Sequence, residues 1–88
     1  MNPFSMTVRS TVQMGESLRR RRKLLGWSQE DLSRRSGVKQ ANLSAIENGA
    51  QGVRLGTIFR LLAAMDLELS ISQRRKTLRD RTKRNLAN

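Results

Sequence analysis

Five residues near the middle of the chain have side chains suited to contacting the edges of nucleic-acid bases. They are Lys39, Gln40, Ala41, Asn42 and Ser44. An amide carries a donor and an acceptor together and can pair with adenine, an ammonium group donates to guanine acceptors, and a methyl or hydroxyl group fits close to a base edge. This run predicts a surface that reads the major groove of duplex DNA, although a merely solvated polar helix face is the plainer interpretation.

The remaining residue types offer little for catalysis or metal binding. The chain contains no cysteine and no histidine, which removes disulfides, ordinary zinc sites and thiol or imidazole catalysis. Asp, Glu, Ser and Lys are present, but no spacing groups them as a nucleophile with its base. We therefore expect no catalytic residue, no metal site and no cofactor.

Size and charge narrow the partners further. The 88 residues fit one small domain, and 18 Lys and Arg against 7 Asp and Glu give a net charge of +11. Such a charge favours binding to a polyanion such as nucleic acid. No apolar run approaches the roughly 20 residues of a membrane-spanning helix, and the start lacks the pattern of a signal peptide. We expect a cytoplasmic, nucleoid-associated protein without a membrane partner.

The base-contacting residues must be carried by a short helix that follows a tight turn. Ser28 and Asp31 have the spacing of a capping box at the start of a preceding helix. Gly37 can adopt the positive φ that a three- or four-residue turn requires. The inward positions of both helices are apolar: Leu32, Val38, Leu43 and Ile46. A capped helix, a glycine turn and a second helix in this order predict a helix-turn-helix, whose second helix presents its first residues to the bases.

Two further helices should complete the domain. Ser10 and Gln13 have capping-box spacing, and predict a helix from Ser10 to about Leu25 that stops at Gly26. Its apolar face is Met14, Leu18 and Leu25, with Arg21 at the position between them. After a loop at residues 50–54, a second stripe has helical spacing and is expected in the core; its members are Leu55, Ile58, Leu61, Leu62 and Met65. Trp27, between two helices, is expected to plug the core.

The ends of the chain differ from this domain, which we place at residues 10–72. Residues 1–9 lack periodicity and are expected to be flexible. Residues 73–88 contain seven basic residues and one acidic residue, a net charge of +6, and are expected to be disordered without a partner. This tail could be a solvated appendage, or an arm that contacts phosphates or a partner.

Residues 67–72 change from helical spacing to strict alternation. Leu67, Leu69 and Ile71 fall on one side, and polar residues fall on the other. A lone strand leaves its backbone donors and acceptors unpaired. The pattern therefore predicts a dimerisation strand that pairs with its copy in a homodimer.

The domain resembles the phage-repressor-like (XRE/Cro) helix-turn-helix family over about residues 14–66. The resemblance is carried by Leu18, Arg22, Gly26, Ser28-Gln29, Leu32, Gly37, Ser44, Ile46-Glu47 and Gly49. It implies an all-α bundle of four or five helices that binds operator DNA as a two-fold dimer. It also implies that Gln29 contacts a phosphate and braces Gln40, and that Arg22 and Glu47 form an internal ion pair.

With the strand at residues 67–72, the chain resembles the HipB group of antitoxins in particular. That resemblance implies autorepression of an operon, a HipA-like serine/threonine kinase toxin as partner, and base contacts by Lys39, Gln40 and Ser44. The basic tail departs from the group's pattern. Two alternatives stay open: a stand-alone phage or chromosomal repressor, and a basic RNA-binding protein. Against RNA, only Phe4, Trp27 and Phe59 could stack a base.

Overall fold

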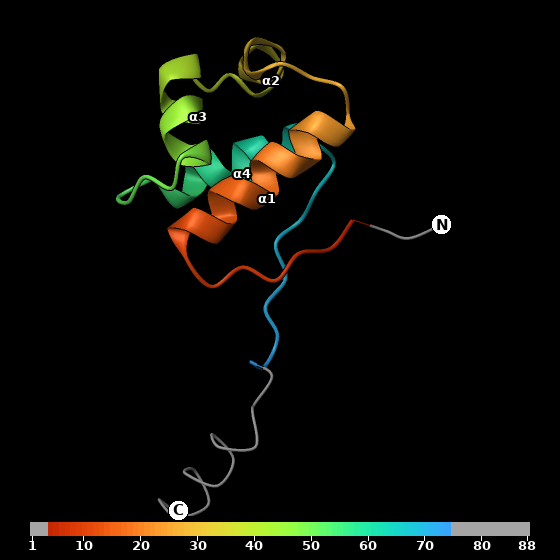
Figure 1. Cartoon of the computed structure of the whole chain (residues 1–88), viewed down its shortest axis with the longest axis vertical. Helices are drawn as coiled ribbons and strands as arrows, with labels where there is room; N and C mark the ends of the chain where they lie inside the picture. Colours follow the sequence, from red (N-terminus) through yellow and green to blue (C-terminus); the bar gives the residue numbers. More distant parts are fainter. Residues whose placement is uncertain (1–3, 75–88) are drawn as a thin grey trace, which may run out of the picture.

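Four helices make up the fold in the computed structural model, which describes residues 4–74 (Figure 1). They are α1 (Thr11–Leu24), α2 (Gln29–Ser36), α3 (Gln40–Glu47) and α4 (Leu55–Ala64). Helix α3 packs against α1 and α2, and α2 also packs against α4. The described part of the chain is all-helical, as expected, with four helices out of the predicted four or five.

The helix starts follow the predicted caps, with one difference. The Ser28 hydroxyl accepts from the Asp31 N–H and the Asp31 carboxylate accepts from the Ser28 N–H, so the capping box of α2 is complete. At α1, the hydroxyl of Ser10 accepts from the N–H of Gln13 at 3.0 Å. The Gln13 side chain, however, accepts from the N–H of Arg9. The predicted second half of that box is therefore wrong by one residue, because the longer side chain of Gln13 reaches past the cap.

Two glycines allow the tight packing of α1, α2 and α3. Gly37 ends α2 with a φ of 75°, and its N–H donates to the carbonyl of Ser33 at 2.9 Å. Gly15 lies where α1 crosses the end of α3, and a Cβ there would collide with the carbonyl oxygen of Ile46. The absence of a side chain at position 15 sets how closely α1 approaches α3.

The core contains nearly all the apolar residues expected from helical spacing. Its buried members are Leu18, Leu32, Val38, Leu43, Ile46, Ile58, Leu61, Leu62 and Met65. Met14, Leu25 and Trp27 are half-buried and pack against this core. Leu55, expected in the core, is 58% exposed. That expectation is wrong because Leu55 opens α4, and the packed face of the helix begins only at Ile58.

Arg21 occupies the boundary between the core and the surface. Its Nε donates to the carbonyl of Met65 at 3.1 Å, and its guanidinium lies 5.6 Å from the centre of the Phe4 ring. Met65 is the C-cap of α4, where the aligned peptide dipoles favour a cation. The position between Leu18 and Leu25 is therefore polar because it ties α1 to the end of α4.

The segment after α4 has no regular secondary structure through residue 74. Leu67 packs partly against the core, whereas Leu69 is 42% exposed and Ile71 is 94% exposed. No strand forms among residues 4–74, so the strand predicted at residues 67–72 stays a prediction, as do the domain boundaries. Residues 4–9 also lack helix and strand, and residues 1–3 and 75–88 lie outside the described part of the chain.

Candidate nucleic-acid interface

The first turns of α3 present the side chains predicted to contact bases. Lys39 is the N-cap of α3, and Lys39, Gln40, Ala41 and Asn42 are all exposed. Ser44 is half-buried. The N-cap side chain makes no capping hydrogen bond, since an ammonium group has no acceptor, so the first N–H groups of α3 have no side-chain cap. This surface thus combines amide, ammonium and free backbone donors.

The opposite face of α3 is fixed in the bundle. Leu43 is fully buried, Ile46 is 4% exposed, and Val38 just before the helix is 4% exposed. The turn before α3 is closed by side chains of α2, because the Ser33 hydroxyl donates to the Val38 carbonyl and the Ser36 hydroxyl accepts from the Val38 N–H. These contacts fix which face of α3 points outward.

The ion pair implied by the resemblance is present. Arg22 donates twice to Glu47: Nε to Oε2 at 2.7 Å and Nη2 to Oε1 at 2.9 Å. Both residues are buried. The third guanidinium nitrogen, Nη1, donates to the carbonyl of Trp27 at 2.8 Å. A two-point contact of this kind fixes orientation as well as distance. It joins α1 to the last residue of α3 and to the chain just before α2.

Gln29 completes this network in a way the resemblance did not imply. Its Nε2 donates to Oε1 of Glu47 at 3.1 Å, so Gln29 braces the end of α3 in this structure, whereas bracing of Gln40 was expected. An amide nitrogen carries two hydrogens. The second hydrogen of the half-buried Gln29, at the first position of α2, is available for a phosphate oxygen.

The surroundings of Glu47 determine its charge. Burial on its own raises the pKa of Glu47, but the hydrogen bonds from Arg22 and Gln29 outweigh burial and hold that pKa below its ordinary value. The same hydrogen bond to Glu47 raises the pKa of Arg22. Every buried side-chain nitrogen and oxygen in residues 4–74 has a hydrogen-bond partner. The pair is therefore ionised and fully satisfied near neutral pH.

A stacked pair beside this network could not be predicted from the sequence. The guanidinium of Arg35, in the last turn of α2, lies 4.2 Å from the centre of the Trp27 ring. Trp27 was expected to plug the core, and it does pack against it, but the ring is only half-buried. The Arg35 guanidinium covers part of the Trp27 ring that the core leaves exposed. Arg35 lies two turns beyond the start of α2, and no short-range pattern signals such a contact.

Other kinds of site are not formed by the described residues. Within residues 4–74, no three His, Cys, Asp or Glu side chains gather as a metal site would need. No helix in the same part of the chain is long and apolar enough to cross a membrane.

Comparison with known proteins agrees with this geometry. The chain matches the helix-turn-helix family over residues 18–72. It is 31% identical over 62 residues to antitoxin HipB of Escherichia coli (strain K12), covering 70% of each chain. A solved HipB-O4 20mer complex shares 27% identity with a TM-score of 0.74, over 81% of this chain and 100% of that chain. A HipA-HipB-O2-O3 complex gives 27% identity and a TM-score of 0.73 over the same shares. The chain therefore belongs to the helix-turn-helix family, in the branch that includes antitoxin HipB.

Proposed function

We propose that the chain is a sequence-specific repressor that binds operator DNA as a homodimer and serves as the antitoxin of a type II toxin-antitoxin module. The observation that carries this proposal is the exposed polar start of α3, held in place by the Arg22–Glu47 pair. The likeness to HipB bound to a 20mer supports the same function for this surface.

Base recognition is assigned to Lys39, Gln40 and Ser44, with Ala41 and Asn42 beside them on the same helix. Two copies of α3, related by the dimer axis, would enter successive major grooves about 34–36 Å apart and read an inverted repeat. Gln29, at the start of α2, would contact a phosphate of the DNA backbone. Repression follows because the dimer occupies the promoter.

The dimer is assigned to the strand at residues 67–72. Leu67, Leu69 and Ile71 supply its apolar side, and the backbone of a second copy supplies the missing hydrogen-bond partners. A cytoplasmic location follows from a function on chromosomal DNA.

The toxin partner is a HipA-like serine/threonine kinase. The support for it is the likeness to HipB, which is seen together with HipA in a solved complex. Co-expression with the kinase encoded nearest to this gene should yield a stable complex. Failure to form one would favour a stand-alone repressor of the same fold.

The base contacts are tested by Gln40→Ala. We expect it to weaken binding to the selected operator by about 1–3 kcal/mol, because a bidentate amide contact to a base is lost, and to relax the base preference at that position. Titration in mobility shifts measures both effects, and Thr7→Ala, an exposed change outside α3, is the matched control.

An equal loss on random duplex would mean that Gln40 reads no base. Preference for a structured RNA over every duplex would favour the RNA-binding alternative and contradict the proposed function.

A further inference from the structure

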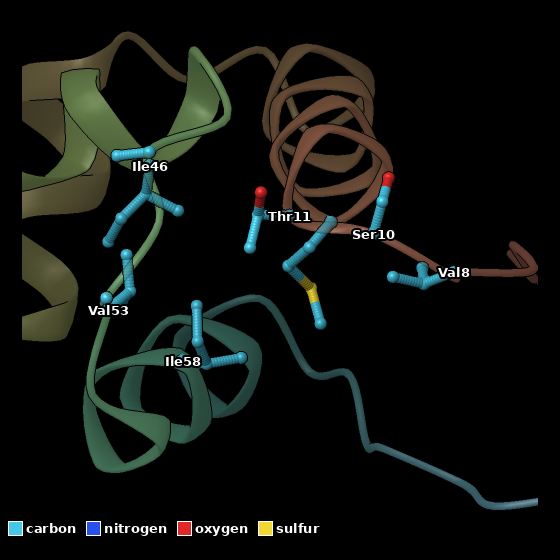
Figure 2. A pocket seen from close by; sticks show the side chains of 9 residues that line it. Val8, Ser10, Thr11, Ile46, Val53 and Ile58 are labelled. Carbon is cyan, nitrogen blue, oxygen red and sulfur yellow. The ribbon is translucent and has the colours of Figure 1, made fainter.

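An open groove lies beside the end of α3 and takes no part in the proposed DNA contacts. One wall is formed by Val8 of the N-terminal segment and by the first turns of α1, and the other by Ile46, Val53 and Ile58 (Figure 2). Its volume is about 320 Å³ and no charged residue lines it. An open groove with this lining is a place where water finds few partners, so an apolar occupant is favoured.

The same chain carries apolar side chains that lack a place to pack. Leu69 is 42% exposed and Ile71 is 94% exposed, although both belong to a strictly alternating segment whose first apolar member, Leu67, packs against the core. Alternation puts Leu69 and Ile71 on the same side of an extended chain. Residues 4–74 thus combine an unfilled apolar groove with an alternating segment whose apolar side chains at positions 69 and 71 are exposed.

Charge favours this segment over the rest of the chain as the occupant. Residues 66–72 contain Asp66 and Glu68 and no cation, in a chain with a net charge of +11. Arg9 and Arg54, the chain neighbours of the lining residues Val8 and Val53, are exposed. Two copies with this charge repel each other over most of their surfaces. An acidic segment of one copy is attracted instead to the second copy, which is strongly basic and has these two arginines next to lining residues in the sequence. The basic residues 75–88 have the same sign of charge as the second copy, so they would be repelled from it.

We propose that the groove receives Leu69 and Ile71 of a second copy of this chain. The proposal rests on the dimer of the proposed function and adds the surface on which the partner's segment packs. Two-fold symmetry fills both grooves at once. Because Ile46 belongs to the last turn of α3, the partner's side chains would pack directly on the helix that carries the base contacts, so dimerisation would support the orientation of α3.

Engineered disulfides test the placement, and the chain is suited to them because it contains no cysteine. A variant with both Val53→Cys and Ile71→Cys is oxidised, separated on a non-reducing gel and digested for mass spectrometry. We expect a covalent dimer whose linked peptides join position 53 of one copy to position 71 of the other. Leu24→Cys with Ile71→Cys is the control, since Leu24 is 67% exposed at the opposite end of α1.

Three results would overturn the placement: a disulfide within one chain, links only between two copies of position 71, or equal linking in the Leu24 control. The first would mean that the segment folds back into its own groove. The second would mean that the strands meet but do not reach the groove.

A second measurement does not depend on cysteine chemistry. Val53→Asp places a charge in the groove and should weaken the dimer about tenfold or more in sedimentation, because a buried aliphatic contact is lost. Leu24→Asp should leave the dimer unchanged, with helical content followed by circular dichroism. If Val53→Asp fails to fold, Ile71→Ser gives the same test, since so exposed a side chain adds little to the monomer fold.

The outcomes separate this inference from the proposed function. A wild-type protein that sediments as a monomer at micromolar concentration contradicts the proposed dimer itself. A wild-type dimer unaffected by Val53→Asp and Ile71→Ser contradicts only the groove.

Discussion

Glu47 is the residue on which three helices depend. Its carboxylate accepts from Arg22 of α1 and Gln29 of α2 while it ends α3. Removing one partner of a buried pair leaves the other charged and unpaired, which typically costs about 3–5 kcal/mol. We expect Glu47→Gln to lower the free energy of unfolding by an amount in this range, measured by urea denaturation at neutral pH. Glu16→Gln, an exposed change on α1, should have little effect, and equal effects would contradict this account.

The same carboxylate predicts a pH dependence of stability. The pKa of Glu47 is lower in the folded protein than its ordinary value of 4.5. A group with a depressed folded pKa contributes stability that is fully present above the ordinary value and is lost as the pH falls through the folded value. We therefore expect the free energy of unfolding of the wild type to fall below about pH 4.5. The decline should be shallower in Glu47→Gln, and parallel curves would show that other carboxylates dominate.

Residue types alone could not have located this network. Five consecutive cations, residues 19–23, look alike in the sequence, yet one is buried against Glu47 and its neighbour Arg21 caps α4. The pairing of Arg22 with Glu47 was accessible only through resemblance to a family. The bond from Gln29 to Glu47 was not, because it depends on how α2 and α3 are placed relative to each other.

At the scale of elements, the crossing of α1 and α3 depends on the missing side chain of Gly15. Gly15→Ala raises helix propensity, but its Cβ would collide with the carbonyl of Ile46, so we expect a lower melting temperature. Gly56→Ala is a matched control inside α4, where a Cβ meets nothing within 4 Å. It should stabilise the protein by about 0.5–1 kcal/mol. Thermal unfolding of both variants checks the contrast. A stabilised Gly15→Ala would mean that α1 can move away from α3 at little cost.

The helices themselves were largely predictable because their signals are local. The caps at Ser10 and Ser28, the turn at Gly37 and the apolar positions of α2 and α3 all act within one or two turns of the chain. Leu55 shows the limit of prediction from such local signals. Helical spacing says which side of α4 it shares with Ile58, but not how far along α4 the neighbouring helices extend.

For the whole molecule, the distribution of charge predicts how affinity depends on salt. Residues 73–88 carry a net charge of +6, more than half of the +11 of the chain. Each phosphate neutralised adds about −0.9 to the slope of log affinity against log salt. A protein ending at Ser72 should therefore bind its operator more weakly and with a shallower slope, while keeping its base preference. Filter binding at several salt concentrations measures this. Unchanged slopes would identify the tail as a solvated appendage.

The fold class and the exposed polar start of α3 could be predicted from the sequence, but the assembly of two chains could not. An isolated chain shows that residues 67–72 alternate and that Ile71 is exposed. Of their backbone groups, the Leu67 N–H donates to the carbonyl of Leu62, and those of residues 68–72 make no backbone hydrogen bond within residues 4–74. In the proposed dimer, a second molecule supplies partners for those groups, and a property of two chains can only be proposed from the structure of one.

Trp27 gives the protein a natural optical probe. It is the single tryptophan in a chain without tyrosine, its carbonyl accepts from Arg22, and its ring lies under Arg35. Light absorbed selectively by indole would therefore be emitted from this one corner between α1 and α2. Changes in intensity or quenching would report on the contacts around that corner without any attached dye.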